Sequence, residues 1–244
     1  MKIIAPKALV AKLWMALALV GIFSGLLLGY HLLERQSVTA STGRRTDALV
    51  VIDPGHGGFD GGASAADGTL EKTINLRIAC MLRDCLESMG VQTVMTRTQD
   101  SGTEDADASG IREKKVSDLK NRLALMHQTP DRIFVSIHQN HFSQSVYSGT
   151  QVFYSGNHPA SAVLADCIRK AVVTDLQPGN RREIKRSGSE IFLLHQAKAP
   201  AVMVECGFLS NKEEAAKLKS EPYQKQLAFL IALGILDYFH AEEY

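Results

Sequence analysis

The sequence predicts an α/β fold: a single domain with a twisted, mostly parallel sheet of about six strands and helices on both faces. Two observations support this fold class. From residue 48 onward, short aliphatic runs alternate with longer segments whose apolar residues recur at helical spacing, a pattern typical of parallel sheets. The chain also has 244 residues, 45% of them hydrophobic, so it can bury a substantial core.

The first elements follow one another closely. Residues 48–52 are a compact aliphatic run, which indicates a strand. In residues 70–89 the apolar side chains share one helical stripe, and Gly90 follows as a helix terminator. Residues 91–96 are the next predicted strand. Residues 98–115 are acidic, contain glycine and have no periodicity, so we expect an exposed loop there.

The second half of the domain continues the alternation. A helix is predicted over 116–127 and another over 159–175, whose inner face is apolar, and the chain closes with an amphipathic helix over 223–239. The remaining predicted strands are 132–137, 149–154, 191–194 and 201–204.

The first 33 residues differ from the rest. Residues 1–12 carry three lysines and no acid, and residues 13–33 contain no charge over 21 positions. A signal-peptide core usually has roughly 7–15 apolar residues, whereas a membrane-spanning helix needs about 20. Length therefore favours an uncleaved N-terminal anchor in 1–33, with its lysine end in the cytoplasm. The alternative is a signal peptide cleaved after residues 38–40, a small-x-small site.

Both alternatives export the body of the protein to the extracytoplasmic face of a membrane. Residues 34–47 are polar and predict a linker, which leaves 48–244 as the folded domain. Without the three N-terminal lysines, the 27 basic residues fall to 24 against 26 acidic ones, a net charge of −2. Binding of nucleic acid by charge alone would require a basic surface, so we expect no nucleic-acid partner.

Four cysteines, at positions 80, 85, 167 and 206, lack the spacing of a disulfide-stapled small domain. The sequence contains no Cys-x-x-Cys pair, so nothing in it indicates a structural zinc site. We therefore expect free, buried thiols.

Three residues form a set that can bind a metal ion: His56, Glu71 and His138. Two imidazoles and a carboxylate make the three-ligand shell that a catalytic zinc uses when a fourth position is left for water. His56, His138 and Glu205 each follow an aliphatic strand, and ligands gather at this edge of open α/β sheets. Glu205 is a second carboxylate, available for proton transfer. The pattern predicts a metal-dependent hydrolase.

Several residues near this set also have a purely structural interpretation. Glu71 lies in the first turn of a predicted helix, where the helix dipole alone favours a carboxylate. Asp53 either orients an imidazole or braces the turn after its strand. Asn140 and His141 are candidate substrate contacts. The glycines at 57 and 58 are no phosphate-binding loop, because no Gly-Lys-Ser/Thr follows them.

Four motifs together carry a family resemblance: VVIDPGHGGFDGGA at 50–63, LEKTINL at 70–76, VSIHQN at 135–140 and PAVMVECGFLSN at 200–211. In this order they resemble the zinc-dependent N-acetylmuramoyl-L-alanine amidases of bacterial cell-wall metabolism. The resemblance covers about residues 49–239.

This resemblance implies one catalytic Zn²⁺ bound by His56, Glu71 and His138, with Glu205 as the catalytic carboxylate. It also implies a substrate, the amide bond between N-acetylmuramic acid and L-alanine in peptidoglycan. Alternatives are a peptidase or deacetylase acting on the same polymer, and a non-catalytic wall-binding domain. An accessory activating protein is a candidate partner.

The stretches SDLKNRL at 117–123, SIHQNHF at 136–142 and SGTQVFY at 148–154 look most like the spore-cortex, germination-associated branch of the family. This implies a role in sporulation and germination, in cortex maturation through muramic-lactam formation, and a location at the forespore. Gln139 and His141 depart from the family pattern, in which small residues usually follow the second histidine.

Overall fold

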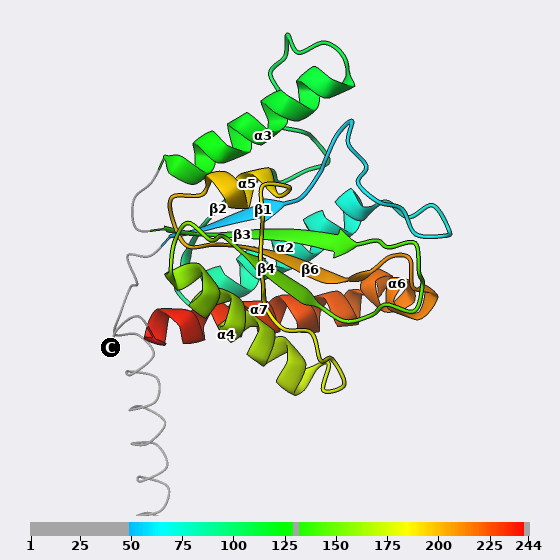
Figure 1. The fold of residues 1–244 in the computed structure, drawn as a ribbon, viewed down its shortest axis with the longest axis vertical. Coiled ribbons are helices and arrows are strands. Elements are labelled where there is room, and N and C mark those ends of the chain that lie inside the picture. The colour runs from blue at the N-terminus through cyan, green and yellow to red at the C-terminus, as the bar shows by residue number, and fades with distance from the viewer. Residues whose placement is uncertain (1–48, 129–131, 242–244) are drawn as a thin grey trace, which may run out of the picture. The chain divides into compact units, whose positions relative to one another are not determined.

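A six-stranded sheet forms the centre of the computed structural model, which describes residues 49–128 and 132–241 (Figure 1). The strand order is β2-β1-β3-β6-β4-β5. Strands β1, β2, β3 and β6 are parallel, whereas β4 runs antiparallel to β6 and carries β5 parallel to itself. The mostly parallel sheet is thereby confirmed. The strand bounds are β1 Leu49–Pro54, β2 Gln92–Met95, β3 Arg132–Asn140, β4 Gln151–Tyr154, β5 Lys185–Arg186 and β6 Ala201–Phe208.

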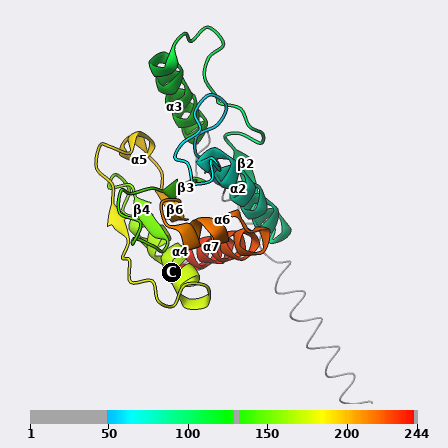
Figure 2. The ribbon, with the colours of Figure 1, turned by 90° about the vertical axis from the view of Figure 1, so that its right-hand side faces the viewer.

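Helices cover both faces of this sheet, as predicted (Figures 1 and 2). On one face lie α2 (Glu71–Ser88), α4 (Ala160–Asp175) and α7 (Glu221–Ala241). The other face carries α3 (Ile111–His127) and the short α5 (Phe192–Gln196), while α6 (Lys212–Lys219) follows the end of β6.

Strand β1 is buried on both faces of the sheet, which explains its continuously aliphatic sequence. Val50 and Ile52 enter the larger core with α2, α4 and α7, whereas Val51 enters the smaller one on the α3 and α5 side. A parallel strand buried on both faces has no need for polar residues at alternate positions. All three side chains are at most 1% exposed.

Residues 191–194 were predicted as a strand, and this is wrong: they lead into helix α5. The run Ile-Phe-Leu-Leu is apolar and short, so periodicity cannot distinguish a strand from one buried helical turn. Leu193 and Leu194 pack into the smaller core, and the His195 amide closes the turn by donating to the Ile191 carbonyl.

The exposed loop predicted over 98–115 is shorter than expected. Helix α3 begins at Ile111, inside the stretch 98–115, because its first turn faces solvent and needs no apolar stripe. There the Glu113 carboxylate accepts hydrogen bonds from the Ser109 amide and hydroxyl, which satisfies donors at the helix start. Helix α6 and strand β5 were not predicted at all.

Strands β3 and β6 continue beyond their aliphatic runs. His138 and Glu205 therefore lie inside the strands, as register partners, and not just past them as predicted.

The four cysteines are free thiols, as predicted, although Cys206 is the only one of the four that is fully buried.

The predicted anchor at 1–33 and linker at 34–47 lie outside the described residues. Within 49–128 and 132–241, no helix combines the length and apolarity needed to cross a bilayer.

Helices α4 and α7 pack so closely that Gly234 has no room for a side chain. A Cβ atom there would lie 2.5 Å from the Ile168 Cα and 2.9 Å from the Cys167 carbonyl oxygen. We expect Gly234→Ala to lower the free energy of unfolding by about 1–3 kcal/mol through overpacking, despite the better helix propensity of alanine. Urea denaturation measures this. Gln226→Ala, on the exposed side of α7, is the control, with a change within about 0.5 kcal/mol; equal effects would contradict the packing argument.

Candidate active site

The loop after β1 places His56 in a backbone conformation that non-glycine residues rarely adopt. Its φ of 60° is left-handed, a strain that the surroundings must hold in place. Two buried arginines do so. Arg122 donates to the His56 carbonyl at 2.7 Å and to the Pro54 carbonyl at 2.9 Å. Arg97 donates to the carbonyls of Pro54 and Gly55 at 2.9 and 3.0 Å.

Two glycines of the same loop leave space for the candidate ligands. A Cβ atom at Gly55 would overlap the ring of His138. At Gly62, where φ is 67°, a Cβ atom would lie 2.6 Å from the Glu71 Oε2 and 2.7 Å from the His56 ring. These positions are therefore small because imidazole and carboxylate groups approach the backbone directly.

Glu71, the first residue of α2, is only 3% exposed. Its Oε2 accepts from the Ala63 amide at 2.8 Å, and its Oε1 accepts from the Gln139 amide at 3.0 Å and the Asn75 side chain at 3.2 Å. The same two oxygens face the candidate ligand nitrogens: His56 Nε2 lies 3.2 Å from Oε2 and His138 Nδ1 lies 3.0 Å from Oε1.

The structure thus brings His56, Glu71 and His138 together, although they lie in three separate segments. One ligand atom from each residue lies within 4.8 Å of the others. The rings of the two histidines stand edge to face, with their centroids 4.9 Å apart. Two imidazole nitrogens and a carboxylate oxygen fit the donor set of a catalytic zinc.

The charges of these residues shift one another's pKa values. Burial alone would raise the pKa of Glu71, but hydrogen bonds and charge from His138 and His56 hold it well below its usual range. Burial would likewise lower the pKa of His56, yet Glu71 and Asp60 raise it to about 9. Because a metal ion binds neutral imidazole, metal binding at this cluster competes with protonation of His56.

Asp60 is a functional candidate that the sequence did not reveal. Its Oδ2 lies 3.0 Å from the His56 Nδ1, so it fixes the ring with Nε2 turned toward Glu71. A carboxylate in a glycine-rich segment is common on loop surfaces, so only the distance to His56 identifies this one.

Asp53 does not contact an imidazole within the described part of the chain. Its Oδ1 accepts from Arg122 at 2.6 Å and Thr96 at 2.7 Å, and its Oδ2 accepts from Ser136 at 2.7 Å. Burial would raise the pKa of Asp53, but the Arg122 charge and these hydrogen bonds lower it. The contacts match the alternative in which Asp53 braces the turn.

Glu205 lies beside His138 on the adjacent strand, as its register partner. The Oε2 atom of Glu205 is enclosed and has no hydrogen-bond partner among the described residues. Burial raises the pKa of Glu205 to about 7; the charges of His138 and His56 oppose this rise, and the charge of Glu71 adds to it. A carboxyl group with a pKa near neutrality suits proton transfer at neutral pH.

The remaining candidates are less closely placed. Asn140 ends β3 and lines a groove together with Gln151 and Phe208, whereas the His141 side chain is exposed to solvent.

The fold and this cluster define the class: an α/β protein with a candidate metal-centred hydrolytic site. The family model described as N-acetylmuramoyl-L-alanine amidase matches residues 50–237. The chain therefore belongs to the N-acetylmuramoyl-L-alanine amidase family.

Known relatives agree with this membership. The germination-specific N-acetylmuramoyl-L-alanine amidase of Bacillus subtilis (strain 168) is 34% identical over 191 residues, which cover 78% of this chain and 79% of that protein. The CwlD amidase of Clostridioides difficile, solved in complex with the GerS lipoprotein, aligns with a TM-score of 0.76 and 38% identity over 79% of this chain and 98% of that one. An N-acetylmuramoyl-L-alanine amidase from Clostridium difficile 630 aligns with a TM-score of 0.70 and 31% identity, covering 80% of this chain and 98% of that one.

The contact of Asp60 with His56 can be tested by zinc affinity. We expect Asp60→Ala to weaken zinc binding about 10–100-fold, because the imidazole loses the group that orients it. Competition with a chromophoric chelator measures this without reference to activity. Asp67→Ala, which removes an exposed carboxylate bonded to Lys219, is the matched control. Unchanged zinc affinity in Asp60→Ala would show that His56 needs no such support.

Proposed function

We propose that residues 48–244 form a zinc-dependent amidase that hydrolyses the amide bond between N-acetylmuramic acid and L-alanine in peptidoglycan. One observation carries the proposal: His56, Glu71 and His138 converge within 4.8 Å, with the enclosed carboxyl of Glu205 on the neighbouring strand. Membership of the amidase family supports the choice of bond over a peptide or an acetyl group.

Each residue has a distinct task in this reaction. A zinc ion bound by His56, Glu71 and His138 would supply Lewis acidity and an activated water. Glu205 takes a proton from the attacking water and then delivers it to the departing alanine nitrogen, which an amide needs because a free amide anion is a poor leaving group. Asp60 keeps the His56 Nε2 directed into the site.

We further propose a role in the spore cortex. The relative from Bacillus subtilis is named germination-specific, and the solved CwlD structure is also similar over the whole domain. That structure contains a lipoprotein partner, which supports an accessory protein for this chain as well. Deletion of the gene in a spore-forming host would test the role: cortex that retained muramic lactam would contradict it.

The proposed site of action is outside the cytoplasm, with residues 1–33 as an uncleaved membrane anchor. The 21 uncharged residues at 13–33 support this placement. N-terminal sequencing of native protein from the membrane fraction tests it: a mature chain beginning at Ser41 would establish a cleaved signal instead.

Digestion of purified peptidoglycan, followed by mass spectrometry, tests the reaction itself. An amidase releases peptides with N-terminal alanine and leaves the lactyl carboxylate on the glycan. A peptidase or a deacetylase would leave that amide intact. Activity lost on chelation and restored by zinc is the expected outcome, and full activity in metal-free protein would contradict zinc dependence.

The two carboxylates should respond differently to neutralisation. Glu71→Gln removes charge from the ligand set, so zinc content and rate should fall together. Glu205→Gln leaves three ligands, so zinc should stay near one per chain while kcat falls about 10²–10⁴-fold. Metal analysis and peptide release on the same preparations measure both quantities.

Two outcomes would contradict this assignment. Loss of zinc from Glu205→Gln would make Glu205 a ligand. Retention of both zinc and most of the activity would leave Glu205 without an essential role.

A further inference from the structure

A groove crosses β6, β4 and β5, and one of its lining residues is the register partner of Glu205. Gln151 of β4 is the register partner of Glu205, and Lys185 of β5 is that of Phe153, so these side chains share one face. The groove encloses about 230 Å³. Its lining residues are Asn140, Phe142, Tyr147, Gln151, Phe153, Arg182, Lys185 and Phe208.

Two cations and no acid line this groove. The Arg182 guanidinium is held in place: its Nε donates to the Ser148 carbonyl at 2.8 Å, and its Cζ lies 4.6 Å from the centre of the Phe208 ring and 5.7 Å from that of Tyr147. Its Nη1 contacts Gln151 Oε1 at 3.4 Å. Within the described residues no carboxylate lies within ion-pair distance of Arg182. A guanidinium that is held in place and has no carboxylate partner among the described residues is suited to bind a carboxylate.

A second cavity, which His56 and His138 themselves line, has the opposite charge balance. Its other charged lining residues are the acids Asp53, Asp60 and Asp118 and the cations Lys115 and Arg122. Those carboxylates pair with their own partners, so this side offers no comparable unpaired cation. An anionic part of a substrate is therefore favoured on the Arg182 side.

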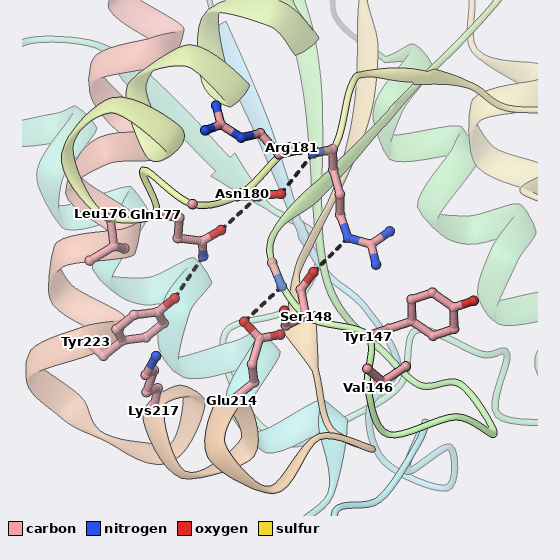
Figure 3. Close-up of a pocket in the computed structure, with 13 residues that line it drawn as sticks. Val146, Tyr147, Ser148, Leu176, Gln177, Asn180, Arg181, Glu214, Lys217 and Tyr223 are labelled. Carbon is pink, nitrogen blue, oxygen red and sulfur yellow. Dashed lines mark hydrogen bonds between the residues drawn. The ribbon is translucent and has the colours of Figure 1, made fainter.

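Arg182 and Tyr147 also line a larger pocket next to the groove. In Figure 3, Tyr147 and Val146 stand at one end of it and Tyr223 and Lys217 at the other. Its polar side chains bond to one another and to the backbone, as in the contacts from Gln177 to Tyr223 and from Glu214 to the Gly149 amide (Figure 3). These bonds fix the loops that carry Arg182, and they leave the smaller groove as the candidate subsite.

We propose that this groove holds the stem peptide and that Arg182 binds the free carboxylate of its second residue, the glutamate that follows alanine. The inference rests on the proposed amidase function. Neighbouring strands lie about 4.8 Å apart, so the two strand spacings from β6 to β5 span roughly 10 Å. An extended chain covers this distance in about three residues, at roughly 3.3–3.6 Å per residue. Because Arg182 contacts Gln151 on the strand next to Glu205, we expect it to contact the second residue of the stem peptide. Lys185, one strand farther, would contact a later residue.

Paired substrates test the assignment in the full-length, zinc-loaded protein. They are muramoyl peptides that differ only in the second residue, glutamate with its free α-carboxylate or the same residue as the α-amide. Arg182→Gln should lower kcat/KM about 10–100-fold on the acid, as expected for a charge-assisted hydrogen bond, and less than about threefold on the amide. Arg182→Lys, which keeps the charge but loses the planar fork, should fall between wild type and Arg182→Gln on the acid.

The control is Arg181→Gln, which removes the same charge from the adjacent residue, a lining residue of the larger pocket only. It should leave both substrates unaffected. The ratio of acid to amide cleavage is independent of the fraction of folded enzyme, so a folding defect cannot mimic the result.

Equal losses on acid and amide in Arg182→Gln, or no loss on either, would overturn the assignment while the amidase function stood. Failure of the wild-type enzyme to cleave either substrate would instead refute the proposed function.

Discussion

The carboxylate of Glu71 holds the candidate site together. It lies between two imidazoles, at 3.0 Å from His138 Nδ1 and 3.2 Å from His56 Nε2, and it also accepts hydrogen bonds from the backbone at Ala63 and Gln139. Burying a carboxylate is costly unless it is paired and hydrogen-bonded, and here both oxygens are. The loop after β1, the start of α2 and the end of β3 therefore meet at one side chain.

The residues around Glu71 give the candidate ligands space and hold the loop that carries His56. The small residues Gly55 and Gly62 give the ligand side chains room, and two arginines tie down the carbonyls around His56. A left-handed histidine would be unfavourable in a free loop; here the cost is offset by buried, charge-assisted hydrogen bonds. The parallel sheet adds Glu205 as the neighbour of His138, so the proposed proton carrier lies beside one of the proposed metal ligands. Hydrolysis would require the reacting groups to be held in a fixed geometry, and a rigid sheet edge provides this.

Local motifs were enough to predict much of this arrangement. His56, His138 and Glu205 each follow an aliphatic run, and the order of elements indicated the sheet and its two helical layers. Asp60 could not be predicted, because its contact with His56 depends on a left-handed backbone that no local pattern reveals. Nor could Arg122, whose hydrogen bond to the His56 carbonyl joins residues 66 positions apart. The strand predicted at 191–194 failed for a different reason: four apolar residues fit a strand and a buried helical turn equally well.

The central claim is that one zinc ion binds where Glu71 meets the two imidazoles. Anomalous diffraction at the zinc absorption edge, from crystals of the zinc-loaded protein, tests it most directly. We predict a single strong peak in contact with His56, Glu71 and His138. A peak elsewhere on the domain, or one bound by both histidines without Glu71, would contradict it.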